Sequence, residues 1–162
     1  MRVFHYTVVN YLPAIFERNM LMPTAKDSEK EQAVWFSTNP EWEETANKSY
    51  HCGDGIPIEG NKWDSYKIYG GLARIEVAPE IAPYNWEQYK KISNITMQKA
   101  QEIEAHAAEC NADPGEWRVS FEPVPRDNFI SVEVLDWDNQ AWEDFMVAYE
   151  KTKKRMEDHH HE

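Results

Sequence analysis

Several features that would define a function class are scarce or absent in this chain of 162 residues. The two cysteines, Cys52 and Cys110, are too few for a disulfide scaffold. There is no signal peptide and no apolar run of membrane-spanning length, so we expect a cytoplasmic protein without a membrane partner. A Walker-type phosphate loop, a dinucleotide glycine fingerprint, a Gly-x-Ser-x-Gly elbow and a His-Glu-x-x-His helix are also absent. Their absence weakens nucleotidase, dehydrogenase, hydrolase and metalloprotease interpretations.

Basic residues are few relative to acidic ones, with 17 against 29 and a net charge of -12. Such a field repels phosphate backbones and anionic membranes, so broad nucleic-acid binding is not expected. A local basic groove stays open as an alternative, and its candidates are Lys90, Lys91, Arg74, Arg118 and Arg126.

The apolar content of 41% and the aromatic content of 13% are typical of a globular chain. We expect one domain over residues 1–156, followed by a disordered histidine-containing tail over 157–162. The sequence leaves the oligomeric state open.

Periodicity and turn residues predict strands and helices in an irregular order. Long loops are expected at 24–32 and 48–66, and regular crossover units are missing. The order predicts an α+β fold with a mixed or antiparallel sheet. The predicted strands are 2–7, 33–38, 69–77, 116–121 and 129–137, and the predicted helices are 8–18, 41–47, 85–110 with a break near 93–94, and 139–156.

His5 is the first candidate for chemistry, because it lies near the end of a short strand that leads into an amphipathic helix. Side chains at such a junction project into crevices while their backbone stays rigid. The alternative is a polar residue at the boundary of a strand with no function.

Three segments resemble, in their order, the motifs of the ADP-ribosyltransferase superfamily over residues 2–135. His5-Tyr6-Thr7 is similar to the opening of the DNA-targeting toxins of that superfamily and, more distantly, of the RNA 2′-phosphotransferases. Trp35-Phe36-Ser37-Thr38 is similar to the aromatic-Ser-Thr strand of its arginine- and toxin-type branches. Glu116, in Gly115-Glu116-Trp117-Arg118-Val119, stands where the superfamily carries its catalytic glutamate.

The resemblance implies an ADP-ribosyltransferase-like α+β domain with a split sheet that binds NAD as a substrate. It implies cleavage of the nicotinamide-ribose bond and transfer of ADP-ribose to an unknown macromolecular acceptor. Glu116 would be the catalytic carboxylate and His5 the ribose anchor. The residues expected to bind NAD are His5, Tyr6, Thr7, Trp35, Phe36, Ser37 and Thr38.

The chemistry also has a physical basis that does not depend on the resemblance. Breaking the bond between nicotinamide and ribose leaves positive charge on the sugar, which a fixed carboxylate such as Glu116 stabilises. It could also accept a proton from the nucleophile. Each assignment has a structural alternative: Glu116 as an exposed strand residue, Trp35 and Phe36 as core, Ser37 and Thr38 as the end of a strand.

Two departures from the family pattern limit the assignment. No glutamate stands two residues before Glu116, so the Glu-x-Glu arrangement of arginine-modifying members is absent and arginine modification is disfavoured. No basic residue matches the diphosphate contact, with Arg18 and Arg74 as the candidates considered. The alternative function is a non-catalytic relative that binds a nucleotide or a protein.

A metal centre is the weaker interpretation, and we expect none. His106 and Cys110 are four residues apart on a predicted helix and so share a face. His51 and Cys52, in a glycine-containing loop, could complete four nitrogen and sulfur ligands for zinc, but the usual Cys-x-x-Cys spacing is missing.

Overall fold

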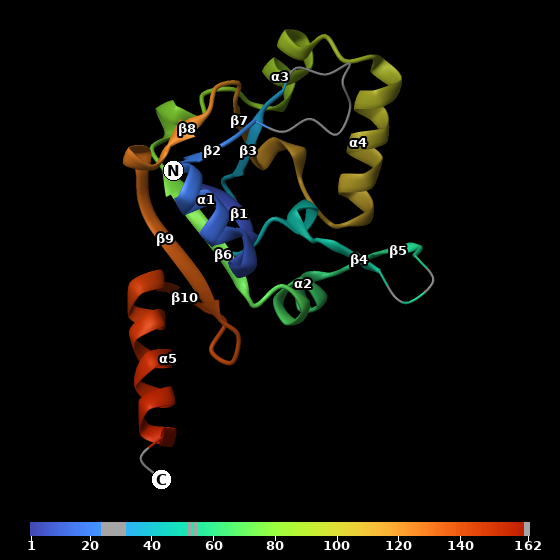
Figure 1. The fold of residues 1–162 in the computed structure, drawn as a ribbon. Coiled ribbons are helices and arrows are strands. Elements are labelled where there is room, and N and C mark those ends of the chain that lie inside the picture. The colour runs from blue at the N-terminus through green and yellow to red at the C-terminus, as the bar shows by residue number, and fades with distance from the viewer. Residues whose placement is uncertain (24–31, 52, 54, 161–162) are drawn as a thin grey trace.

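The centre of the molecule is a six-stranded antiparallel sheet with the order β10-β9-β6-β1-β3-β7 (Figure 1). The computed structural model describes residues 1–23, 32–51, 53 and 55–160, so the loop expected at 24–32 lies outside the described residues except for Gln32. The strands are β1 (Val3–Val8), β3 (Val34–Ser37), β6 (Leu72–Val77), β7 (Trp117–Ser120), β9 (Phe129–Asp136) and β10 (Ala141–Asp144). The α+β expectation with an antiparallel sheet is confirmed.

Two small antiparallel pairs accompany the main sheet. β2 (Met20–Leu21) pairs with β8 (Val124–Pro125), and β4 (Ser49–His51) pairs with β5 (Pro57–Glu59). Figure 1 shows the β4–β5 hairpin projecting from the body of the molecule on the side where α4 ends.

Asparagine and threonine fix several helix ends. Asn61 and Asn85 each form a capping box, and Thr96 accepts a hydrogen bond from the Lys99 amide. Asn19 ends the first helix in the left-handed conformation, with φ of 59°. The helices are α1 (Leu12–Arg18), α2 (Lys62–Ile68), α3 (Trp86–Ser93), α4 (Met97–Glu109) and α5 (Phe145–His160), with 3-10 turns at Val9–Tyr11, Glu44–Ala46, Pro79–Ile81, Pro114–Glu116 and Arg126–Asn128.

Two expected elements are corrected by the structure. The segment 48–66, expected to be one long loop, contains the β4–β5 hairpin and most of α2. The helix expected to begin at Asn139 begins at Phe145, because residues 141–144 pair with β9 as strand β10. Helix α5 also continues past residue 156, where we placed the start of the disordered tail.

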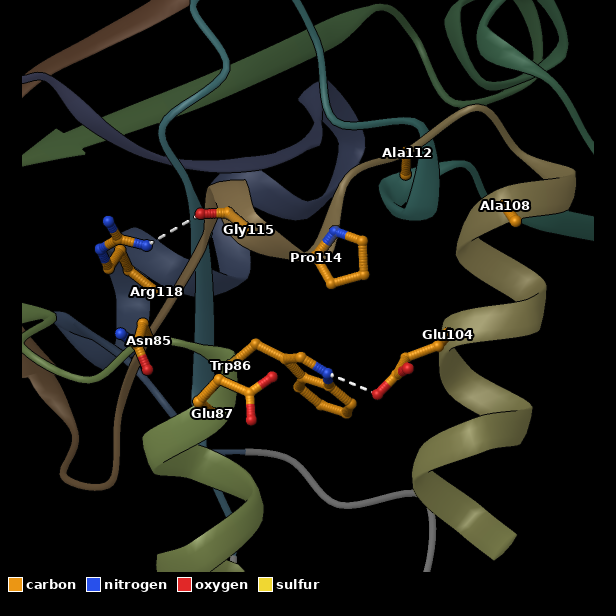
Figure 2. Close-up of a pocket in the computed structure, with 9 residues that line it drawn as sticks. All are labelled: Asn85, Trp86, Glu87, Glu104, Ala108, Ala112, Pro114, Gly115 and Arg118. Atoms are coloured by element: carbon orange, nitrogen blue, oxygen red, sulfur yellow. Dashed lines mark hydrogen bonds between the residues drawn. The ribbon is translucent and has the colours of Figure 1, made fainter. Parts of the chain in front are cut away.

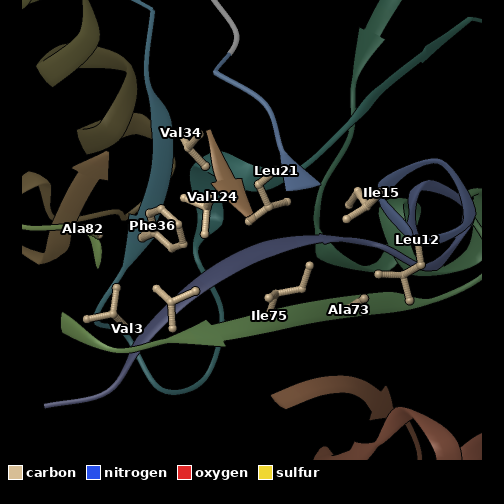
Figure 3. Close-up of a cluster of buried hydrophobic side chains, with 11 residues drawn as sticks. Val3, Leu12, Ile15, Leu21, Val34, Phe36, Ala73, Ile75, Ala82 and Val124 are labelled. Atoms are coloured by element: carbon tan, nitrogen blue, oxygen red, sulfur yellow. The ribbon is translucent and has the colours of Figure 1, made fainter. Parts of the chain in front are cut away.

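The two faces of the sheet carry different cores. Val3, Phe36 and Ile75 lie on one face, in one cluster with Leu12 and Ile15 of α1, which lie at the Ala73 end of the cluster (Figure 3); we call this the α1 face. Side chains that alternate with these point to the opposite face, which we call the tryptophan face. Its two clusters contain Trp35, Trp86 and Trp117 at one end and Phe4, Tyr6, Trp42 and Leu72 at the other.

The sheet is weakly joined between β1 and β3. β1 pairs with β6 over six residues and β3 pairs with β7 over four, but β1 and β3 share the single register pair Phe4↔Ser37. The apolar core of the α1 face spans both halves, because it contains Val3 of β1 and Val34 of β3. Packing therefore holds the two halves together where backbone pairing is sparse.

Candidate functional site

Glu116 belongs to the 3-10 turn that precedes β7 in the chain. In space it lies beside the end of β3. The Thr38 amide donates a hydrogen bond of 2.8 Å to the Glu116 carbonyl, and the Thr38 hydroxyl donates a second one of 3.1 Å. The side-chain amide of Asn39 donates to the Glu116 carboxylate at 3.5 Å. Backbone and side chains from two strands therefore fix the position of Glu116.

Asn39 connects Glu116 to two further candidates from the sequence. Its backbone amide donates to the Ser37 hydroxyl at 3.1 Å, and its backbone carbonyl accepts a hydrogen bond from the Tyr6 hydroxyl. We call Tyr6, Ser37, Thr38, Asn39 and Glu116 the Asn39 cluster. Its members come from β1, the end of β3 and the start of β7.

The environment of the Glu116 carboxylate differs from that of the nearby Glu43 carboxylate. Burial raises the pKa of Glu116, the hydrogen bond from Asn39 opposes this, and the charges of Glu43 and Asp113 add to it. Glu43 is buried and accepts from the Trp117 indole at 3.1 Å and from the Thr45 hydroxyl at 2.7 Å. Glu116 is half-buried and accepts one long hydrogen bond within the described residues. Glu43 is thus engaged in structure, whereas Glu116 retains capacity for a ligand.

His5 lies on the α1 face and bridges the two halves of the sheet. Its Nδ1 lies 2.8 Å from the Trp35 carbonyl, and its ring contacts Phe36 edge-on with centroids 5.8 Å apart. A carbonyl only accepts, so Nδ1 carries the proton and Nε2 is left as an acceptor. Burial lowers the pKa of His5 to about 4, despite the Trp35 bond, which raises it. The imidazole is therefore neutral at pH 7.

Tyr6 and Arg74 form a buried polar pair on the tryptophan face. Arg74 donates to the Tyr6 hydroxyl at 3.3 Å, to the Pro40 carbonyl and to Glu133 at 3.0 Å. Burial raises the pKa of Tyr6 to about 12, so it stays a neutral donor toward Asn39. Because Arg74 is committed to these partners, its guanidinium serves the fold and not a diphosphate.

Most of the residues expected to bind NAD are packed into the protein. Tyr6, Thr7, Phe36 and Ser37 are buried, and the half-buried Trp35 ring packs on Trp86, Tyr89 and Trp117. A base could not stack on Tyr6 or Phe36 without displacing core side chains. The burial and packing of these rings favour the interpretation of Trp35 and Phe36 as core side chains.

Two hollows are lined by neighbours of Glu116, which itself lines neither of them. The first, of about 410 Å³, lies between α3, α4 and the turn that carries Gly115. Figure 2 shows the Trp86 indole directed across it toward Glu104, at a distance of 3.0 Å, and Arg118 beside Gly115. The second, of about 350 Å³, is lined by Asn39, Glu41, Trp42, Glu44, Cys110 and Asn111. Glu116 follows Gly115 of the first hollow and bonds Asn39 of the second.

Arg118 is the basic residue nearest to Glu116 in sequence, and it lines the first hollow. It donates to the Trp117 carbonyl at 2.7 Å and to the Gly115 carbonyl at 3.3 Å, which are neutral acceptors. None of the ion pairs between described residues includes Arg118. From the sequence we considered Arg118 as a candidate for a basic groove and not as a diphosphate ligand, although it stands two residues after Glu116.

Hydrogen bonds join Glu116 to Thr38 directly and to Tyr6 and Ser37 through Asn39. Among the described residues, the hydrogen bond of His5 goes instead to the Trp35 carbonyl. Alternation directs His5 to the α1 face, whereas Tyr6, whose hydroxyl bonds Asn39, lies on the tryptophan face. Sequence reasoning missed Asn39, because the turn that folds it back over Tyr6 depends on the tertiary contacts of Pro40.

Among the described residues, none of the helices is both long and apolar enough to cross a membrane. No protein-family model matches the chain, and neither the curated proteins nor the solved structures include a match to it.

Proposed function

We propose that the protein cleaves the nicotinamide-ribose bond of NAD and transfers ADP-ribose to a macromolecular acceptor, with Glu116 as the catalytic carboxylate. Nicotinamide leaves with the electron pair of the broken bond, and positive charge develops on the ribose. The Glu116 carboxylate stabilises that charge and accepts the proton of the attacking acceptor group.

The observation that carries the proposal is the state of Glu116. A half-buried carboxylate with a raised pKa and a single long hydrogen bond is typical of functional positions, because structural carboxylates satisfy their oxygens internally. Two hollows adjoin it, and Arg118 in the first could bind a diphosphate. The sparse β1–β3 pairing supports the split sheet that the resemblance implies.

His5 has a separate role in the proposal. Its Nε2 is a fixed acceptor that suits a ribose hydroxyl, since the Trp35 carbonyl orients the ring. A ligand that touches both His5 and Glu116 would have to reach from the α1 face to the turn before β7, where Glu116 lies beside the end of β3.

That separation favours a second candidate, a non-catalytic relative that binds a nucleotide or a protein in the same region. The burial of Tyr6, Phe36 and Ser37 points the same way, because these side chains contribute to the core. A relative of this kind would keep the Asn39 cluster for structure and show nucleotide affinity without turnover.

Nicotinamide release from NAD separates the two candidates. We expect Glu116→Gln to lower the rate by about 100-fold or more, the range seen when one charge-stabilising group is removed. Glu122→Gln is the matched control, since Glu122 is an exposed glutamate just beyond β7, and should keep the parent rate. Equal rates in the parent and Glu116→Gln would remove Glu116 from catalysis. An NAD-induced rise in Tm without turnover would favour the binding relative.

The stability of Glu116→Gln shows whether the variant is folded. A carboxyl whose folded pKa is raised favours folding while it is protonated, and this contribution is lost as pH rises through that pKa. Removing the charge should therefore raise Tm at pH 7 and leave it unchanged in acid. A loss of activity with a lower Tm would indicate misfolding instead.

A further inference from the structure

We propose that Glu59, His106 and Cys110 form a Zn²⁺ site with a fourth position open to water. The three side chains offer one oxygen, one nitrogen and one sulfur ligand, all within 4.8 Å of one another. Zinc accepts this combination of donors in proteins. The site is independent of the proposed transferase activity, because none of its residues belongs to the Asn39 cluster.

Two of the three separations between donor atoms are close to the edges of a tetrahedron around zinc. His106 Nε2 lies 3.3 Å from Glu59 Oε1 and 3.7 Å from Cys110 Sγ. Bond lengths of about 2.0–2.1 Å for nitrogen and oxygen and about 2.3 Å for sulfur give tetrahedral edges of about 3.4 Å and 3.6 Å. The third separation, between the donor atoms of Glu59 and Cys110, is no more than 4.8 Å, so an ion could enter with an adjustment of the exposed Glu59 side chain.

Two elements bring the ligands together. His106 and Cys110 are separated by one turn at the end of α4, so they share a face of that helix. Glu59 is the last residue of β5, where it pairs with Ser49. The next residue, Gly60, fits closely, because a Cβ there would lie 2.5 Å from the Lys48 carbonyl oxygen. The absence of a side chain at Gly60 lets the end of the hairpin pack at the position that holds Glu59.

The charges around Cys110 favour a cation. The carboxylates of Glu59, Glu109, Glu44 and Glu43 lie close enough to Cys110 to act on it electrostatically. A divalent ion would compensate this negative charge and displace the thiol proton. Cys110 also lines the second hollow, so a bound ion would lie beside that hollow.

This ligand set differs from the one considered from the sequence. His51 pairs with Pro57 at the other end of the hairpin, and Glu59 takes its place beside His106 and Cys110. Cys52 lies outside the described residues. The two ligand sets differ because β4 and β5 pair as a hairpin, whereas the sequence predicted a loop over 48–66.

Metal titration of the full chain tests the site. His159, His160 and His161 could bind metal by themselves, so all variants carry alanine at these positions. Zinc affinity is measured by competition with a metallochromic chelator, and Co²⁺ is used as a probe of thiolate coordination by its charge-transfer absorption. We expect one equivalent to bind, with a thiolate-to-cobalt band in the parent.

Substitution of the ligands gives the expected pattern. Cys110→Ser should abolish the cobalt band, and Cys110→Ser, His106→Gln and Glu59→Gln should each weaken zinc binding by more than about tenfold. Glu109→Gln, a carboxylate on the same helix, and Cys52→Ser, the other thiol, are controls that should stay within about twofold of the parent.

Three results would overturn the site. The first is the absence of zinc binding once the terminal histidines are replaced. The second is unchanged affinity in the three ligand variants. The third is loss of the cobalt band in Cys52→Ser, which would assign the thiolate to the wrong cysteine. Melting curves without metal check that each variant is folded, and the exposure of Glu59 and His106 predicts that their substitutions are tolerated.

Discussion

At the scale of single residues, polar side chains in the sheet divide into those that hold the fold and those with unused capacity. Arg74, Tyr6 and Glu43 have several internal partners each. Within the described residues, Glu116 accepts one long hydrogen bond, and His5 uses Nδ1 for its hydrogen bond and keeps Nε2 as an acceptor. We expect function in this second group, because a ligand can bind there without breaking the core.

His5 predicts a specific pH dependence of stability. Its pKa falls from 6.5 to about 4 on folding, so the unfolded chain binds the proton more readily. Its contribution to stability is therefore present above pH 6.5 and is lost as pH falls toward about 4. Melting curves at pH 7 and at about pH 5 should show a larger fall in Tm for the parent than for His5→Asn. Parallel pH profiles of parent and variant would contradict the neutral buried imidazole.

Arg74 predicts a large difference between two arginines that both pair with glutamate. Arg74 is 4% exposed and donates to Glu133, Tyr6 and Pro40. Lysine lacks the planar fork that makes these bonds, so Arg74→Lys should cost about 2 kcal/mol of unfolding free energy in denaturant titrations.

The exposed Arg2–Glu76 pair provides the control, because surface ion pairs contribute little. Arg2→Lys should change stability by less than about 0.5 kcal/mol. Similar losses of unfolding free energy in the two variants would show that the buried network around Arg74 contributes no more to stability than the exposed pair.

At the scale of secondary-structure elements, those with a strong periodic pattern could be predicted from the sequence, whereas the short hairpin could not. The predicted strands 2–7 and 33–38 correspond to β1 and β3, and the helix break predicted near 93–94 separates α3 from α4. The β4–β5 hairpin was missed, because its strands have three residues each and all but one of these residues are exposed. Such strands form through their neighbours and not through their own hydrophobic pattern.

The candidate site, too, could be predicted only in part from the sequence. The sequence indicated Glu116 and the Ser37-Thr38 end of β3, which the structure places side by side. It could not indicate Asn39, whose contacts depend on a turn that crosses Tyr6.

Gly60 predicts that the β4–β5 hairpin depends on a close backbone contact. A methyl group at Gly60 would lie 2.5 Å from the Lys48 carbonyl oxygen, which must then move. We expect Gly60→Ala to lower stability by about 1 to 3 kcal/mol, measured by thermal unfolding.

Gly115→Ala is the matched control, because a methyl group there would meet only the Asp113 side chain, at 3.1 Å. It should have the smaller effect on Tm. A Gly60→Ala variant as stable as the parent would show that the hairpin adapts to the added group.

At the scale of the whole molecule, the sheet consists of two parts joined by one register pair and a shared core. β10, β9, β6 and β1 form the larger part, and β3 and β7 form the smaller part. The Asn39 cluster lies where the smaller part meets β1. One hollow is lined by Gly115, which precedes Glu116, and the other by Asn39, which donates a hydrogen bond to it. A ligand bound at this junction would add contacts between parts that share little backbone pairing.

The net charge of -12 belongs to the same scale. It disfavours anionic ligands in general, so a dinucleotide needs local positive charge, which Arg118 supplies in the first hollow. The same field favours divalent cations, in agreement with the proposed zinc site.

The most direct test of the central claim is a crystal structure of the chain with NAD bound. We expect the nicotinamide-bearing ribose at the end of β3, with a ribose hydroxyl within about 3.2 Å of the Glu116 carboxylate. NAD bound away from Glu116, or no NAD bound at saturating concentration, would contradict the assignment of Glu116 as the catalytic carboxylate.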